Sequence, residues 1–378
     1  MIYLDNAASS WPKPEGVAER MAECVREYAA NPGRGSHQLG MKASRVVFEA
    51  RRKVAKLFGV KNPDNVVFTM NATHALNLGI KGFVQAGDHV ITTMLEHNAV
   101  RRPLEFLKGL GVEVTYVETD ELGRVEVESF RKEIRENTRL IVVTHGSNLT
   151  GTLVPVKEIG EVAEAHGVVL MVDVCQTAGV YEIDVEEMKI GMLAFTGHKS
   201  LYGPQGTGGL YIRPDLDVRP LMEGGTGGYS ELVEMPTTRP DRYEAGTVNT
   251  VGLAGLLAGV EFLEEVGLEK VREHEERLTE RLHRGLLEVS GVKVVGPPLG
   301  ESRVPIVSFA VEGFESHEVG FILDRNYGIC VRAGLHCAPL AHESVKTVED
   351  GLVRASIGYF NTEAEVDALV EAVREIVG

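Results

Sequence analysis

The chain has 378 residues, of which 43% are hydrophobic and 25% charged, as in an ordinary globular protein. This length is too great for one small core and favours two domains. The formal net charge of −16 argues against a nucleic acid or an anionic membrane as partner. We also expect no signal peptide, because Asp5 precedes any apolar segment, and no membrane helix, because no apolar run approaches about 18 residues.

In chain order, apolar periodicity predicts a helical region and then alternating strands and helices. Residues 16–58 have helical spacing with an interruption at 31–35, and short apolar runs alternate with helical segments from residue 65 onward. This rhythm predicts a mainly parallel sheet covered on both faces by helices. The predicted strands are 66–68, 89–92, 112–117, 140–144, 168–173, 192–196 and 209–212, and the predicted helices are 73–81, 100–110 and 156–166.

The last third of the chain has a different pattern. Residues 223–250 are rich in Gly, Pro and Thr and predict an active-site loop, and a long amphipathic segment follows over 251–290. Shorter strands and a final helix complete an α+β domain; they are predicted at 292–295, 306–309, 329–331 and 363–376, with Thr362 as N-cap. The predicted division is a large domain of residues 15–258 and a smaller domain of residues 259–378, against which residues 1–14 pack.

Polar residues follow the ends of several predicted strands. Ligands bind at the carboxyl ends of the strands in open parallel sheets. Here those positions hold Asn71 to Thr73, His97, Ser147-Asn148, Asp173 and Thr196 to Lys199. The sequence therefore predicts a site at this edge of the sheet.

Lys199 and Asp173 are the most informative pair at this edge. Lys199 lies in a glycine-rich turn, and Asp173 ends the apolar run of residues 168–172. Pyridoxal 5′-phosphate requires a lysine amine for its covalent attachment and a carboxylate at its ring nitrogen. Each residue alone is more often a solvated loop lysine or a capping acid, but together they favour a pyridoxal-phosphate site.

Seven short strings of residues extend the prediction of a pyridoxal-phosphate site to a protein family. Their order along the chain resembles that of the NifS-like cysteine desulfurases, which belong to the class V aminotransferase group of fold-type I enzymes. The resemblance implies a large domain with a mainly parallel seven-stranded sheet between helices, and a smaller α+β C-terminal domain. The strings are Leu4 to Ser9, Glu96 to Ala99, Ser147-Asn148, Val172 to Gln176, Gly197 to Lys199, Glu244 to Asn249 and, similar to the SufS-type branch, Arg332 to Ala338.

The resemblance implies roles for residues around the cofactor. His97 matches a histidine that stacks on the pyridine ring, and Asn148 and Gln176 match side chains that hydrogen-bond the ring hydroxyl. Thr247 matches a phosphate contact from the partner subunit of a homodimer. The other phosphate contacts are expected from Ala72, Thr73, Thr196 and His198, where a helix N-terminus and hydroxyl groups suit an anion.

Further matches concern the substrate. Arg354 matches the arginine that holds the substrate carboxylate, for which a guanidinium is well shaped. Arg332 and Asn148 are expected beside it. The stretch Arg34 to His37 matches a loop that borders the partner's active site.

Cys337 is the predicted nucleophile. Its neighbourhood, Arg332 to Pro339, has the small residues, the positive charge and the proline of an exposed reactive loop, and nearby positive charge favours a thiolate. The other cysteines, Cys24, Cys175 and Cys330, are expected to be structural. The four form neither a Cys-x-x-Cys motif nor a zinc-spaced cluster, so we expect no metal, and scattered cysteines suit a cytoplasmic location.

The implied reaction converts L-cysteine to L-alanine and leaves a persulfide on Cys337, from which the sulfur passes to an acceptor protein, as in iron–sulfur cluster assembly. A selenocysteine lyase or cysteine sulfinate desulfinase shares this scaffold and stays open as an alternative. A non-catalytic sulfur-relay scaffold is a more distant one. Ser200, Leu335 and the Gly358-Tyr359-Phe360 string depart from the SufS-type pattern and leave the subgroup and the acceptor open.

Overall fold

The computed structural model describes residues 1–33 and 37–378. Its larger part is a seven-stranded sheet of order β2-β8-β7-β6-β5-β3-β4. Five neighbouring strands run parallel, and β8 is antiparallel to both of its neighbours. The predicted mainly parallel sheet is thus confirmed. Its strands are β2 (Val66–Thr69), β3 (His89–Thr93), β4 (Glu113–Val117), β5 (Thr138–Thr144), β6 (Val169–Asp173), β7 (Met192–Thr196) and β8 (Gly208–Ile212).

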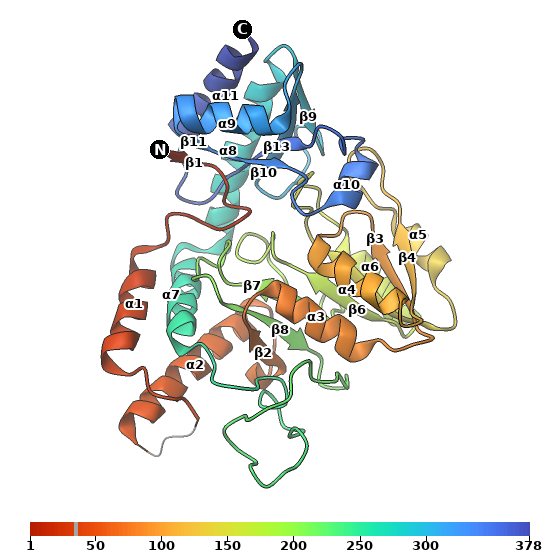
Figure 1. Ribbon diagram of the computed structural model, residues 1–378, viewed down its shortest axis with the longest axis vertical. Coiled ribbons are helices and arrows are strands. Elements are labelled where there is room, and N and C mark those ends of the chain that lie inside the picture. Colours follow the sequence, from red (N-terminus) through yellow and green to blue (C-terminus); the bar gives the residue numbers. More distant parts are fainter. Residues whose placement is uncertain (34–36) are drawn as a thin grey trace.

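Helices cover both faces of this sheet, because the central strands are apolar on both sides (Figure 1). In β6, for example, Leu170 and Val172 join the core on one face, and Met171 joins the core on the other. The first face carries α2 (Gln38–Leu57), α5 (Val127–Glu133), α6 (Val156–Ala165) and α7 (Thr250–Val266), and the second carries α3 (Ala72–Phe83) and α4 (Asn98–Lys108). Helix α1 (Glu15–Glu27) packs against α7.

A second, antiparallel sheet of order β12-β13-β10-β9 lies in the C-terminal part, at the top of Figure 1. Helices α8 (Leu268–Leu287), α9 (Ser316–Tyr327) and α11 (Glu363–Val377) form a separate apolar core with it. The strands are β9 (Val292–Val295), β10 (Ile306–Val311), β12 (Arg332–Gly334) and β13 (Leu352–Ser356), and the short helix α10 (Pro339–Ser344) joins the last two. The predicted α+β arrangement of this part is confirmed, including the cap of α11 by Thr362.

The structure contains elements that were not predicted, among them α5, α10 and β13, and it differs from the predicted pattern in three more places. The segment 251–290 is two helices, not one, because Gly267 adopts φ +89 between α7 and α8, a conformation that favours glycine. Helix α9 was not predicted; exposed Phe321 interrupts the apolar stripe that buried Val319 and Leu323 make. The predicted strand 329–331 is divided into β11 (Ile329–Cys330) and β12.

The N-terminal segment contacts both parts of the molecule. Strand β1 (Ile2–Tyr3) pairs in parallel with β11, and Ser10 N donates to the His198 carbonyl oxygen at 3.0 Å. The predicted division after residue 258 falls inside α7 and stays a prediction. Within residues 1–33 and 37–378, no helix combines the length and the apolar character that a bilayer-spanning segment requires.

Candidate active site

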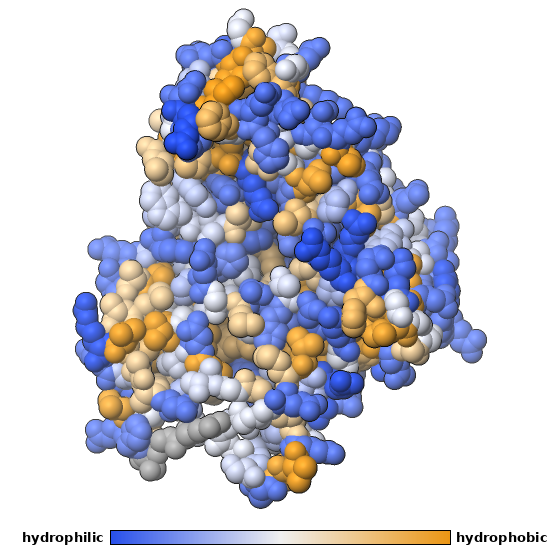
Figure 2. Space-filling model, in the orientation of Figure 1, coloured by the Kyte–Doolittle hydropathy of each residue, from blue (hydrophilic) through white to orange (hydrophobic). Residues whose placement is uncertain are grey.

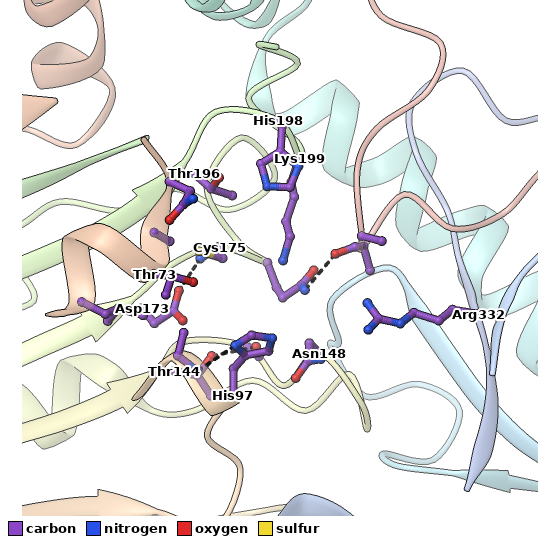
Figure 3. A pocket seen from close by; sticks show the side chains of 18 of the residues that line it. Thr73, His97, Thr144, Asn148, Asp173, Cys175, Thr196, His198, Lys199 and Arg332 are labelled. Carbon is purple, nitrogen blue, oxygen red and sulfur yellow. Dashed lines mark hydrogen bonds between the residues drawn. The ribbon is translucent and has the colours of Figure 1, made fainter. Parts of the chain in front are cut away.

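A pocket of about 200 Å³ opens at the carboxyl ends of the central strands. Side chains from the large sheet, from the N-terminal segment and from the C-terminal sheet line it together. Figure 3 shows Lys199 extending toward His97 and Asn148, with Arg332 pointing in from the right of the view. Most of the predicted site residues lie here: Ala72, Thr73, His97, Asn148, Asp173, Gln176, Thr196, His198, Lys199, Arg332 and Arg354.

The turn after β7 presents Lys199. Gly197 is required there, because a Cβ atom would lie 2.1 Å from Thr207 Oγ1. Tyr202 N donates to Lys199 O at 2.8 Å and closes the turn. The pocket leaves part of the Lys199 side chain exposed, but protein surrounds the amine, and desolvation lowers its pKa below the ordinary value. The turn therefore holds an amine that loses its proton more readily than a surface lysine.

Asp173 lies at the end of β6, where Cys175 N donates to its Oδ1 at 2.9 Å. Cys175 also lines the pocket, and burial together with the neighbouring Asp173 raises the pKa of its thiol well above the ordinary value. A protonated thiol is a poor nucleophile. The sequence indicated the position of Cys175 beside the carboxylate but not that it lines the pocket.

His97 caps the N-terminus of α4 and presents one defined tautomer to the pocket. Its Nδ1 accepts a hydrogen bond from Ala99 N at 3.0 Å, so the neutral ring carries its proton on Nε2. Burial, followed by the charge of Lys199, lowers the pKa of His97 to about 4. The ring is therefore neutral near pH 7 and can donate from Nε2.

One end of the pocket has the chemistry of an anion site. Helix α3 begins at Ala72, and Ala72 and Thr73 of its first turn line the pocket. His198 faces the same pocket, and its Nδ1 is buried with no hydrogen-bond partner among the residues described. Desolvation, with the charges of Lys199 and Lys13, lowers the pKa of His198 to about 4. Buried polar atoms are normally hydrogen-bonded, so an orphaned ring nitrogen here fits a ligand phosphate.

The two amide side chains of the site are each tied to a backbone carbonyl. Asn148 Nδ2 donates to His336 O at 2.8 Å, and Gln176 Nε2 donates to Ala7 O at 3.2 Å. Asn148 thus connects the cofactor side of the pocket to the loop that carries Cys337.

Arg332 and Arg354 face each other on paired strands, β12 and β13. Arg354 is 1% exposed; it donates from Nη2 to Asp5 Oδ1 and from Nη1 to Asn148 O, both at 2.9 Å. Arg332 Nη2 lies 3.5 Å from Cys337 Sγ. The pair provides cationic donors at the end of the pocket away from α3.

Cys337 is half-buried and lies beside the pocket lining, not within it. It and His336 have φ of +57 and +50, a conformation that costs on the order of 1–3 kcal/mol for each such residue. Asn98 N donates to Cys337 O at 2.8 Å. The loop is therefore held in a strained form against α4 and Asn148. The other three cysteines are also free thiols.

Among the described residues, two predicted site residues, Cys337 and Thr247, do not line this pocket. Thr247 is exposed and lies outside the lining. Residues 34–36 of the predicted partner-facing loop lie outside the described residues, and His37 caps α2.

Sequence reasoning missed the part that the N-terminal segment plays. Ala7 and Ala8 line the pocket, Asp5 pairs with Arg354, and Lys13 Nζ donates to His198 O at 2.8 Å. The string Leu4 to Ser9 marked the segment as similar to the family. Its contacts could not be predicted, because they join residues that are 185 and 349 positions apart in the sequence.

These features define a class of protein. The sheet order and the lysine turn are those of a fold-type I enzyme, and the sequence model of the aminotransferase class-V family matches residues 2–369. The chain belongs to this family.

The names of individual relatives are more specific than the name of the family. A probable cysteine desulfurase from Methanothermobacter thermautotrophicus is 38% identical, over 100% of this chain and 95% of the relative. The cysteine desulfurase of Haloferax volcanii is 34% identical, over 99% and 88%. The solved structure of a cysteine desulfurase from Thermococcus onnurineus is similar with a TM-score of 0.94 at 35% identity, covering 100% of this chain and 94% of that one.

Proposed function

We propose that the chain is a pyridoxal-phosphate-dependent cysteine desulfurase that converts L-cysteine to L-alanine and takes the sulfur onto Cys337. The observation that carries the proposal is a single pocket in which Lys199 and Asp173 lie with Arg354, while Cys337 lies next to its edge beside Arg332. Relatives named cysteine desulfurase, aligned over nearly the whole chain, support it.

The residues present fit the cofactor. Lys199 would hold it covalently through its amine, and Asp173 would pair with the ring nitrogen. Ala72, Thr73, Thr196 and His198 would hold the phosphate. When bound, pyridoxal phosphate supplies an electron sink for chemistry at the substrate Cα. His97 would lie against the ring, and its Nε2–H provides a donor there.

The remaining steps belong to the chain and the substrate. Arg354, with Arg332 and Asn148 beside it, would bind the carboxylate of L-cysteine. Lys199, once the substrate amine has displaced its own amine and set it free, would take the Cα proton, and its lowered pKa makes the unprotonated form accessible. The Cys337 thiolate would attack the substrate sulfur, so that an S–S bond forms as the Cβ–S bond breaks. The carbon skeleton keeps the electron pair, takes up protons and leaves as L-alanine.

We also propose a homodimer in which Thr247 reaches the partner's phosphate site. Thr247 is exposed and does not line its own pocket. Exposed apolar side chains suit a subunit interface; those at the tip of the 221–235 loop are visible at the bottom of Figure 2. Exposed apolar side chains in these regions include Leu39, Met41 and Phe48 of α2 and Leu221, Met222, Leu232 and Val233 of the loop. The free, scattered thiols support a cytoplasmic location, and the persulfide implies an acceptor protein.

The Cys337→Ser variant tests this function, with Cys330→Ser as the matched control. Cys337→Ser should keep the bound cofactor but release almost no sulfide from L-cysteine in the presence of a reducing thiol, whereas Cys330→Ser should keep the wild-type rate. Mass spectrometry of the unsubstituted enzyme after one turnover should find one added sulfur on the Cys337 peptide.

The result also separates the rival reactions. If Cys337→Ser desulfurates L-cysteine at the wild-type rate, or if the sulfur lies on another cysteine, the persulfide mechanism is wrong and a lyase-type elimination replaces it. Rates with selenocysteine and cysteine sulfinate on the same preparations then define the substrate.

A further inference from the structure

The ion pair between Asp5 and Arg354 joins the start of the chain to the substrate end of the pocket. The two residues lie 349 positions apart in the sequence, and their side chains meet at 2.9 Å with Arg354 almost wholly buried. The catalytic steps proposed above make no use of Asp5.

The pairing leaves Arg354 with one defined orientation. Arg354 Nη2 donates a hydrogen bond to Asp5, and Nη1 donates one to Asn148 O. Its Nε is buried and has no hydrogen-bond partner anywhere in residues 1–33 and 37–378. An arginine side chain has several rotatable bonds and presents a specific edge only if its other donors are anchored. Asp5 supplies one of the two anchors, and it is the charged one.

Asp5 also counters a like charge. Arg332 and Arg354 are opposite each other in the antiparallel register of β12 and β13, and both line the same pocket. Burial lowers the pKa of Arg354, the Asp5 carboxylate opposes this effect, and the charge of Arg332 adds to it. Without Asp5, Arg354 would be repelled from Arg332 and could leave the position from which it faces the pocket.

The backbone around Asp5 is itself fixed to β13. Asp5 forms a parallel bridge with Ser356, Ser356 N donates to Leu4 O at 2.7 Å, and the Tyr3 hydroxyl donates to Asp5 O at 3.2 Å. The carboxylate is thus carried on a short strand-like segment that is registered on the same strand as Arg354. A segment placed in this way can determine where a neighbouring side chain points.

We propose that Asp5 is a positioning residue for substrate recognition: it orients the Arg354 guanidinium so that the pocket selects a substrate with an α-carboxylate. This role rests on the proposed function, in which Arg354 binds the carboxylate of L-cysteine.

The test compares Asp5→Ala with Asp5→Asn in the holoenzyme. Asp367→Asn is the matched control, because Asp367 makes a comparable but exposed pair with Arg281. Asp5→Ala should raise the KM for L-cysteine about 10-fold with little change in kcat, the size of one lost charge-assisted hydrogen bond. Asp5→Asn, which keeps an acceptor oxygen, should recover most of this loss, and Asp367→Asn should leave the KM unchanged.

Two further measurements separate positioning from general damage. L-cysteine methyl ester lacks the carboxylate, so its kcat/KM should change by less than about twofold in Asp5→Ala. Binding of 3-mercaptopropionate, which has the thiol and carboxylate but no amine to react, should weaken about 10-fold by calorimetry.

Equal losses for L-cysteine and its ester, or unchanged binding of 3-mercaptopropionate, would overturn the proposal. If the wild-type enzyme does not turn over L-cysteine, the proposed function fails, while the binding of 3-mercaptopropionate still decides whether Asp5 positions Arg354. If Asp5→Ala does not fold, the comparison of Asp5→Ser with wild type decides, because serine lacks the carboxylate and is too short to reach Arg354 Nη2: loss of affinity for 3-mercaptopropionate supports the role, and unchanged affinity refutes it.

Discussion

Replacing Glu244 by Gln should destabilise the protein strongly, because Glu244 completes a buried ion pair. Arg51 donates from Nη1 to Glu244 Oε1 at 2.6 Å and from Nη2 to Oε2 at 2.8 Å, and both side chains are less than a tenth exposed. Phe68 N, in β2, also donates to Oε1 at 2.6 Å. One carboxylate thus joins α2, β2 and the loop that continues to Thr247.

The expected cost follows from this geometry. Glu244→Gln places an amide N–H against a guanidinium N–H and leaves the Arg51 charge buried without its counter-ion. Breaking a buried pair in this way costs about 3–5 kcal/mol, or roughly two to four orders of magnitude in the folding equilibrium. Replacing both residues by apolar ones, as in Arg51→Met with Glu244→Leu, should cost much less than the single change.

Urea unfolding followed by circular dichroism would measure these free energies. The exposed Asp367, which pairs with Arg281, provides the control, and Asp367→Asn should cost less than about 1 kcal/mol. The reasoning is refuted if Glu244→Gln is within about 1 kcal/mol of wild type, or if the double variant is less stable than Glu244→Gln.

Three further predictions concern the site and its surroundings. Lys199→Ala should lose covalent cofactor and turnover, and borohydride reduction of the wild type should place the pyridoxyl label on the Lys199 peptide; a label elsewhere contradicts the assignment. Mixing inactive Lys199→Ala chains with inactive Thr247→Ala chains should restore part of the activity in heterodimers, and a fully active monomer by light scattering would exclude a shared site. Burial lowers the pKa of His145 from 6.5 to about 4, so the unfolded chain binds its proton first, and stability is lost as pH falls from 6.5 toward 4. At pH 5 the free energy of unfolding should be lower by roughly 2 kcal/mol because of His145. Unfolding curves of wild type and His145→Gln at pH 7 and pH 5 should show a smaller loss of stability in the variant. An equal loss in both proteins would assign the pH dependence to other groups.

The sequence alone determined the architecture of the large sheet and the identity of its chemical groups. Strands such as β6 are short, continuously apolar runs, and the reason is that helices bury them on both faces. Because parallel strands present their carboxyl ends at one edge, Asp173 and Lys199 could be assigned to one site before any contact was known. The chemical character of Asp173 and Lys199 could be predicted because it depends on the residue type and on the adjacent strand end or turn.

Some elements could not be predicted because local signals were weak or ambiguous. The break at Gly267 lies within a segment whose apolar spacing continues from α7 into α8, and a single glycine in such a segment is compatible with one helix. Helix α9 has an exposed Phe321 that dilutes its apolar stripe. The conformation of Gly267 set the first of these, and burial of Val319 and Leu323 in the C-terminal core accompanies the second.

Only the tertiary structure determined how the distant groups of the site meet. The sequence placed Arg354 and Cys337 in the site, but not the Asp5 carboxylate that anchors the first or the hydrogen bonds from Asn98 and Asn148 that hold the loop of the second. Those contacts join the first residues, the large sheet and the C-terminal sheet. Sequence periodicity reports which face of an element is buried, but it carries no information on which distant partner buries it; that is decided when the two cores and the N-terminal segment pack together.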